Sequence, residues 1–326
     1  MKFEKKWFFV KNRKNNFNER EDWCISRQRT WGVPIPIIFN EDNTPIIEEK
    51  VFDHIIELVR KNGSDNWFEK NAKDLLPVWF DSGSSWTTIA EQKLYPADLY
   101  LEGNIQYRGW FNSSLIISNI TTDQSSFKNC VTHGFVINEK LEKMSKSQNN
   151  AIDPIKITNK YGADILRLWA TIIDYKEDSK FSEGVVQQIC EVYRKIRNIF
   201  KFLLGNLNNG NNQFYNPNDI INEYKVLHIF ILNKLEKTKN FVIESFDKYD
   251  FNRGETQIIN FNVNDLSQFY LNVTKDVLYC DFKDSLRRKQ IQSVIYKITY
   301  TLMCLLTPII PFTMDEVNNN SLPSKR

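Results

Sequence analysis

Two lysines, Lys143 and Lys146, stand three residues apart in a polar segment of the chain. Met144 and Ser145 separate them and Ser147 follows, so the run reads Lys-Met-Ser-Lys-Ser. A lysine ammonium is a compact cation on a flexible stem, which suits it to neutralising phosphate oxygens. A mobile loop with two such groups could stabilise charge that develops on departing pyrophosphate. The alternative interpretation is a solvated basic loop, the usual meaning of an isolated lysine pair.

A second polar segment begins at Trp79 and contains Asp81 followed by Ser-Gly. We expect residues 76–80 to form a short strand, which would place Asp81 at the carboxyl end of that strand. α/β proteins bind ligands at this edge of their sheets. Asp-Ser-Gly is also a common turn sequence, so the segment alone leaves both interpretations open.

A third segment, residues 100–111, repeats this layout. An apolar run leads to Glu102 and Gly103, then to Gln106 and to Trp110 at an expected helix start. A carboxylate at a strand end could hold the ammonium group of a ligand. It could equally form a salt bridge at the rim, because charged side chains are mostly exposed.

Residues 22–32 combine Arg27 and Arg29 with Trp23 and Trp31. Such a group could contact a nucleotide or a nucleic acid through charge and stacking. Composition alone favours an ordinary loop whose rings pack and whose arginines pair with nearby acids.

The elements that must position these residues alternate in type along the first half of the chain. Apolar runs predict strands at residues 33–39, 76–80, 99–102 and 130–137. Helical spacing is expected at residues 51–60 and 109–120. Strands that alternate with helices predict a parallel α/β sheet. His133 falls inside the last strand, so we expect it to be a core histidine rather than a catalytic one.

The second half of the chain has helical spacing almost throughout. Asp153 followed by Pro154 is a strong helix start, and a helix is expected over residues 157–175. Long amphipathic helices are expected at residues 182–204, 224–246 and 284–306, with the Asn-rich stretch 260–264 dividing the last two. Four basic residues lie on or beside the polar face of the first: Arg194, Lys195, Arg197 and Lys201. The expected fold class is α/β followed by an all-α bundle.

Composition limits the class of protein. The chain has 326 residues, 41% of them hydrophobic, and a net charge of +3, which permits a nucleic-acid partner without requiring one. Its five cysteines are scattered without any Cys-x-x-Cys pair, so neither a zinc site nor a disulfide framework is predicted. No apolar run approaches the roughly 18 residues of a membrane span. Residues 1–16 are interpreted as part of the folded body rather than as a transit peptide, and the expected compartment is the cytoplasm, with an organelle as the alternative.

The motifs occur in a fixed order along the chain: residues 22–32, 78–85, 100–111, 132–136, 143–147 and 162–169. This series resembles the isoleucyl-tRNA synthetases of bacteria and organelles, a family of class I aminoacyl-tRNA synthetases. Valyl and leucyl relatives share the lysine loop but differ around the Asp-Ser-Gly and Glu-Gly blocks. The resemblance covers nearly the whole chain and is strongest over residues 22–204.

The resemblance implies that residues 1–180 are part of a Rossmann-type catalytic domain and that residues 181–326 are a truncated anticodon-binding helical domain. Such enzymes use ATP, with Mg²⁺, to join isoleucine to AMP and then transfer it to tRNA(Ile). By motif position, Lys146 would contact the ATP phosphates with help from Lys143, and Glu102 would contact the adenylate. Trp79 and Trp110 would wall the isoleucine side chain. The remaining implied binding residues are Asp81, Gly103, Gln106, Met144, Ser145 and Ser147.

Several family features have no counterpart in this sequence. The His-Ile-Gly-His motif, the editing insertion and the zinc-binding tail are missing, so we expect an internal-to-late portion of a longer enzyme. Ile105 replaces an Asp of the family pattern and Tyr107 replaces a His, which should weaken adenylate binding. Residues 138–143 replace a glycine-rich approach to the lysine loop. The chain is therefore expected to be a fragment or split-gene product that needs a complementary N-terminal half. The alternative is a non-catalytic tRNA-binding or regulatory module derived from such a synthetase.

Overall fold

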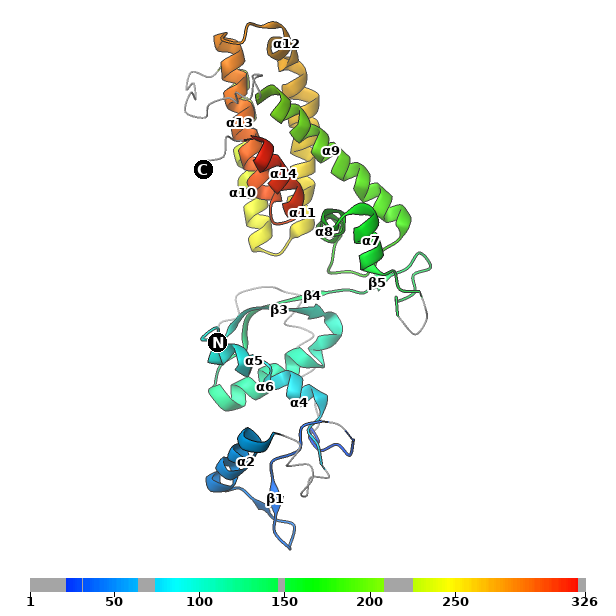
Figure 1. Ribbon diagram of the computed structural model, residues 1–326, viewed down its shortest axis with the longest axis vertical. Helices are drawn as coiled ribbons and strands as arrows, with labels where there is room; N and C mark the ends of the chain where they lie inside the picture. Colours follow the sequence, from blue (N-terminus) through cyan, green and yellow to red (C-terminus); the bar gives the residue numbers. More distant parts are fainter. Residues whose placement is uncertain (1–21, 31, 64–73, 146–149, 208–224, 322–326) are drawn as a thin grey trace. The chain divides into compact units, whose positions relative to one another are not determined.

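The computed structural model describes residues 22–30, 32–63, 74–145, 150–207 and 225–321 (Figure 1). Contacts divide the chain into two compact units, residues 1–133 and residues 134–326. The domain boundary expected between residues 180 and 181 stays a prediction.

The first unit is built on two parallel strands. β3 (Ala97–Gly103) pairs with β4 (Phe127–His133), in a register that runs from Ala97 opposite Phe127 to Gly103 opposite His133. The connection between them consists of a 3₁₀ turn, η1 (Asn104–Tyr107), and helix α6 (Trp110–Thr122). Parallel strands need a crossover of this kind, usually helical. Its apolar side chains pack on the strands in a small core of Tyr100, Phe111 and Phe127.

The segments before β3 are more helical than the sequence predicted. Strands β1 (Ile38–Phe39) and β2 (Pro45–Ile46) form a short antiparallel pair, followed by α2 (Glu49–Asn62), which confirms the helix expected there. The strand expected at residues 33–39 is only two residues long, because Pro34 and Pro36 lack the N–H donors of a continuous ladder.

The prediction of a strand at residues 76–80 is wrong. The chain enters helix α4 (Val78–Ser84) directly after Pro77, and α5 (Trp86–Glu91) follows. Pro77 has φ −68° and ψ 147°, which is extended backbone suited to the position before a helix. The short apolar run was ambiguous because periodicity cannot separate a strand from a buried helix over five residues.

Helix α4 lies very close to α6 at Gly83. A Cβ at this position would lie 2.8 Å from Ile117 Cδ1 and 2.9 Å from the Ser113 backbone carbon. Overpacking of this kind typically costs about 1–3 kcal/mol. We therefore expect Gly83→Ala to lower the free energy of unfolding of the first unit by about that amount, measured by urea titration followed by circular dichroism.

The matched control is Gly205→Ala, another helical glycine. Nothing lies within 4 Å of a Cβ built on Gly205. Alanine should therefore stabilise its helix by about 0.5–1 kcal/mol through propensity alone. If both substitutions changed stability in the same direction, the close approach at Gly83 would not be the cause.

The second unit begins with a short parallel pair, β5 (Val136–Ile137) and β6 (Ser179–Lys180). The single strand expected at residues 130–137 is thus two strands, β4 and β5. Gly134 separates them, and its backbone is so close to residue 177 that a Cβ would lie 2.4 Å from the Glu177 carbonyl carbon. This close approach admits no side chain and ends the strand.

Two helices follow where one was expected at residues 157–175. α7 (Pro154–Tyr161) starts as predicted, with the Asp153 carboxylate accepting a hydrogen bond from the Ile155 N–H at 2.9 Å. It ends at Gly162, which has φ +93°, and α8 (Ala163–Ile172) begins directly after it. Left-handed φ values are favourable for glycine and break an α-helix.

The rest of the second unit is a helical bundle, as predicted (Figure 1). Its members are α9 (Glu183–Leu207), α10 (Val226–Asp247), α11 (Phe251–Asn260), the π-helix η3 (Phe261–Leu271), α12 (Asn272–Cys280), α13 (Leu286–Leu306) and α14 (Pro311–Ser321). Their apolar faces form one core that also includes side chains of α7 and α8. No helix in the described part of the chain is long and apolar enough to cross a membrane.

The Asn-rich stretch at residues 260–264 does not interrupt the helices. It lies at the junction of α11 and η3, so that α11, η3 and α12 follow one another without a loop. Phe261, Leu266 and Tyr270 are fully buried. These apolar side chains pack in the core of the bundle and keep the segment helical between the two expected helices.

Candidate functional site

Glu102 and His133 lie at the carboxyl ends of neighbouring strands, where parallel sheets usually bind ligands. The Glu102 Oε1 accepts a hydrogen bond from the Gly103 N–H at 2.9 Å, and His133 Nε2 lies 3.9 Å from the same oxygen. The Glu102 and His133 side chains are 50% and 44% exposed. The expectation of a core histidine is therefore wrong, because the strand ends at His133 and leaves the ring at the sheet edge.

Gln106 and Trp110 are brought together at the start of α6. The Gln106 side-chain oxygen accepts a hydrogen bond from the Trp110 N–H at 2.9 Å, so it satisfies one of the free amides of the first helical turn. The Trp110 ring stacks on Tyr100 with centroids 4.3 Å apart, and its Nε1 donates to Ser85 Oγ at 3.2 Å. Ser85 is a site contact that the sequence did not indicate.

Trp79 and Asp81 lie on helix α4 rather than at a strand end, which corrects the geometry expected for both. The Trp79 ring covers Gly109, where a Cβ would lie 2.8 Å from Trp79 Cη2. Trp79 therefore contacts Gly109, which directly precedes Trp110 in the chain. The two residues expected to wall the ligand side chain lie in the same part of the first unit. Asp81 is half-buried, and this burial raises the pKa of its carboxyl group.

The two residues that depart from the family pattern have different environments. Ile105 is 56% exposed. The Tyr107 hydroxyl lies 2.9 Å from Thr132 Oγ1, and its ring packs edge-on against Phe111. Tyr107 therefore ties η1 to strand β4 and to the small core, a role that depends on a hydroxyl and a ring of this size.

The approach to the lysine loop is an ordered turn in the second unit. The Asn138 side-chain oxygen accepts hydrogen bonds from the N–H groups of Lys140 and Glu142, both at 2.9 Å. Leu141 has φ +65°, a left-handed value that non-glycine residues adopt infrequently. A polar side chain closes this turn, where the family pattern has glycines.

The first part of the lysine loop is held by Asn150. Its side-chain oxygen accepts from the Ser145 N–H at 2.8 Å, and its Nδ2 donates to the Lys143 carbonyl at 3.2 Å. The Lys143 side chain is exposed, whereas Met144 and Ser145 are half-buried. Lys146 and Ser147 lie outside the described residues. The supporting role of Asn150 was not predicted from the sequence, although its place seven residues after Lys143 allows its side chain to fold back onto the loop.

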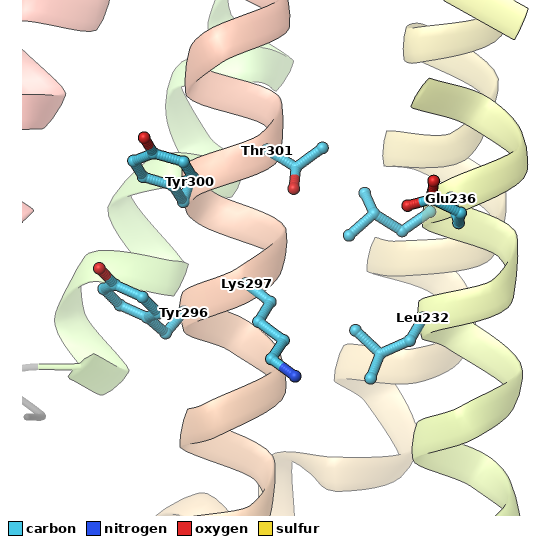
Figure 2. A pocket seen from close by; sticks show the side chains of 7 residues that line it. Leu232, Glu236, Tyr296, Lys297, Tyr300 and Thr301 are labelled. Carbon is cyan, nitrogen blue, oxygen red and sulfur yellow. The ribbon is translucent and has the colours of Figure 1, made fainter. Parts of the chain in front are cut away.

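A separate groove of about 320 Å³ lies between α10 and α13 in the bundle (Figure 2). Its lining consists of Leu232, Leu235, Glu236, Tyr296, Lys297, Tyr300 and Thr301. No predicted site residue contributes to it. The groove is therefore a feature of the bundle surface and is not part of the candidate site.

Two family models match the chain. The model for tRNA synthetases class I (I, L, M and V) matches residues 1–182, which is more than half of the chain. The model for the anticodon-binding domain of tRNA ligase matches residues 229–326. Between them they cover most of the α/β part and most of the bundle.

Curated relatives agree with this match. The isoleucine–tRNA ligase of Limosilactobacillus reuteri is 45% identical over 97% of this chain, and that of Mycoplasmopsis agalactiae is 46% identical over 93%. The chain spans only 36% and 35% of these two relatives. It therefore corresponds to about a third of a typical relative.

Solved structures show the same fold. The methionyl-tRNA synthetase of Mycobacterium tuberculosis in complex with methionyl-adenylate has a TM-score of 0.74 at 18% identity, covering 97% of this chain and 59% of that one. The LeuRS-tRNA-LeuAMS complex of Agrobacterium radiobacter K84 has a TM-score of 0.67 at 19% identity, covering 94% and 41%. The predicted fold class, α/β followed by all-α, is confirmed.

Proposed function

Because this chain belongs to the class I tRNA synthetases of the isoleucine, leucine, methionine and valine group, we propose that it is the later part of an isoleucine–tRNA ligase. The observation that carries this proposal is 45% identity to an isoleucine–tRNA ligase over 97% of the chain. The reaction would be ATP-dependent activation of isoleucine followed by transfer to tRNA(Ile). Residues 1–180 would serve catalysis and residues 181–326 would bind the anticodon region of the tRNA.

The strand-edge residues would hold the aminoacyl-adenylate. The half-exposed Glu102 carboxylate has one oxygen on the Gly103 N–H, which orients the group while leaving it open to solvent. A carboxylate presented in this way can pair with the α-ammonium of isoleucine. Trp79, whose ring covers Gly109, and Trp110, the next residue in the chain, would supply the apolar wall for the side chain.

The lysine loop would handle the phosphates of ATP. Lys143 and Lys146 would supply two positive charges to stabilise the pyrophosphate that leaves during activation. Among the described residues, no cluster of three or more His, Cys, Asp or Glu side chains could hold a metal ion. Mg²⁺ would therefore arrive with ATP, bound mainly by phosphate oxygens and water, as is usual for this ion.

The short sheet supports the need for a complementary N-terminal half. Parallel sheets are almost always covered on both faces, and two strands alone are marginally stable. Among the described residues β3 and β4 pair only with each other, and Leu99 and Leu101 on β3 are 39% and 55% exposed. Further strands and a covering layer from the rest of the catalytic domain would complete this sheet.

The test is isoleucine-dependent exchange of pyrophosphate into ATP. The purified chain alone should show no exchange, and adding the N-terminal half from the same organism should restore it. In the restored enzyme, Lys143→Ala and Lys146→Ala should each lower kcat about 100-fold, the usual effect of removing one transition-state contact. Lys140→Ala, which removes an exposed lysine of the preceding turn, should leave kcat within about twofold. Strong exchange by the single chain would contradict the proposal of a fragment.

A non-catalytic tRNA-binding module is the second candidate. Exposed Ile105 stands where the family pattern has a ribose-binding Asp, which favours loss of adenylate chemistry. In the bundle, Tyr279 at the end of α12 is 66% exposed, Phe282 in the turn that follows is 90% exposed, and Arg287 at the start of α13 is exposed. Nucleobases stack on such rings, and arginine contacts phosphate. Binding of tRNA(Ile) without restored exchange would favour this function.

The polar face of α9 contributes less charge than the sequence suggested. Arg194 pairs with Glu191, and Arg197 forms a hydrogen-bonded ion pair with Glu316 at 2.9 Å. Lys195 and Lys201 are further exposed cations on the helix.

The five cysteines are thiols rather than disulfides, which suits a reducing compartment. We therefore propose the cytoplasm, with an organelle as the alternative.

A further inference from the structure

The backbone of Lys143 is held on both of its sides. Lys143 forms an isolated antiparallel bridge with Ile137 of strand β5. Its carbonyl accepts from Asn150 Nδ2 at 3.2 Å, and the same Asn150 side chain accepts from the Ser145 N–H at 2.8 Å. These main-chain contacts anchor the backbone of Lys143 in this conformation, so rotation of the side chain is enough to move the ammonium.

Phe135 is held equally firmly. Its N–H donates to the Asp178 carboxylate at 2.7 Å, and its carbonyl accepts from the Ser179 N–H at 2.8 Å. The preceding residue, Gly134, packs directly on the backbone of residues 177–178. The Phe135 ring is therefore attached to a fixed point at the base of the lysine loop.

The two side chains meet across this base. Lys143 Nζ lies over the Phe135 ring, 4.0 Å from its centroid, which is within the distance of a cation–π contact. We propose that Phe135 is the resting position of the Lys143 ammonium, and that Lys143 reaches phosphate by swinging its side chain away from this ring. The inference rests on the proposed function of the lysine loop as the phosphate-handling element.

This arrangement makes Phe135 a positioning residue that competes with phosphate for the same ammonium. The ammonium of a lysine is carried on a flexible four-carbon stem, so it can leave the ring while the backbone stays in place. A cation–π contact at an exposed site corresponds to about a two- to fivefold change in an equilibrium constant. Removing the ring should therefore tighten pyrophosphate binding by about two- to fivefold.

The test uses the intact chain and inorganic pyrophosphate as the probe. Lysines carrying ¹³C-methyl groups keep their positive charge and report their surroundings by NMR. In the unmodified sequence the Lys143 resonance, assigned with Lys143→Arg, should be shifted upfield by the ring and should lose this shift as pyrophosphate is added. In Phe135→Leu it should start without the shift, and pyrophosphate should bind about two- to fivefold tighter.

Two controls accompany the measurement. Phe135→Tyr keeps the ring, so it should retain both the upfield shift and the original affinity. Lys160 lies over Tyr161 at 4.9 Å, away from the loop, so its resonance should not respond to changes at Phe135. The proposal is overturned if pyrophosphate leaves the Lys143 resonance unchanged, or if Phe135→Leu binds pyrophosphate no tighter. Neither readout uses the N-terminal half, so failure to restore isoleucine-dependent exchange would be a separate result.

Discussion

Replacing Glu255 with methionine is expected to raise the free energy of unfolding at pH 8 by about 3 kcal/mol. Glu255 is fully buried on helix α11, and neither of its carboxylate oxygens has a hydrogen-bond partner among the described residues. Burial raises the pKa of this carboxyl group to about 7. At pH 8 the folded protein must therefore hold an unpaired charge in its core, which methionine of similar size avoids.

The pH dependence gives the sharper test. The folded pKa of Glu255 is above its value of 4.5 in the unfolded chain, so folding binds a proton between these two values. The contribution of this protonated carboxyl group to the free energy of unfolding is complete below pH 4.5. It is lost as the pH rises through about 7, where the folded protein must give up the proton. Urea unfolding between pH 5 and pH 8 should show this decline in the original chain, and a flatter profile in Glu255→Met and Glu255→Gln.

Glu244→Gln is the matched control on the neighbouring helix α10. Glu244 is exposed and pairs with Lys248, and the hydrogen bond from that lysine lowers the pKa of its carboxyl group. It therefore titrates below the window in which Glu255 acts, and its replacement should leave the slope between pH 5 and pH 7 unchanged. An identical slope in Glu255→Met and the original chain would show that Glu255 does not carry the effect.

Replacing Asp164 with alanine is expected to lower the free energy of unfolding by about 2–4 kcal/mol, because it leaves buried hydrogen-bond donors without an acceptor. The buried Asp164 carboxylate accepts from the Thr313 N–H at 2.8 Å and from its hydroxyl at 2.6 Å. It also accepts from Arg167, whose Nε donates to the Ile309 carbonyl at 3.2 Å. This network joins α8 to the start of α14. Alanine would leave the buried Thr313 donors without an acceptor and would remove the ion pair of the partly exposed Arg167.

The network also has a defined charge state. Burial acts to raise the pKa of Asp164, but the hydrogen bonds from Thr313 and Arg167 outweigh it and hold the pKa below its ordinary value. The carboxylate is therefore ionised at neutral pH, and its stabilisation is lost only as the pH falls below about 3.8. Asp164→Asn, which cannot carry the charge, should lose part of the stabilisation at pH 7.

Glu316→Ala provides the comparison on α14, the helix that Asp164 contacts through Thr313. The Arg197–Glu316 pair also connects α14 to another helix, at 2.9 Å, but the two side chains are 47% and 55% exposed. Exposed pairs contribute about 0–1 kcal/mol. Thermal unfolding followed by circular dichroism should therefore separate the two variants clearly. Equal losses of stability would contradict the assigned role of Asp164.

The predicted elements that the structure confirms are those with strong local signals. The helix at residues 51–60, the one at residues 109–120 and the helix start at Asp153 all have the expected type. Each depends on neighbours within one or two turns, such as the Asp153 side chain bonding the Ile155 N–H. Such signals can be read locally because the interacting groups are close in sequence.

The wrong predictions depend on contacts between distant segments. Gly134 ends a strand because its backbone meets residues 177–178, and the Asn-rich stretch stays helical because Phe261 and Leu266 are buried in the bundle. A strand was expected at residues 76–80, where the chain instead forms helix α4 against α6. None of these outcomes can be read from composition or spacing within the segment itself.

The candidate site also has features that can be read from the sequence and features that depend on contacts between distant segments. The Lys-Met-Ser-Lys-Ser run, the Glu102–Gly103 pair and the tryptophans can be read from the chain alone, because their order identifies the family. The groups that support them become visible only in three dimensions: Gln106 caps α6, Asn150 holds the lysine loop, and Phe135 contacts the Lys143 ammonium. A motif specifies side-chain chemistry, whereas the partners of its side chains are specified by the packing of elements that are separated in the chain.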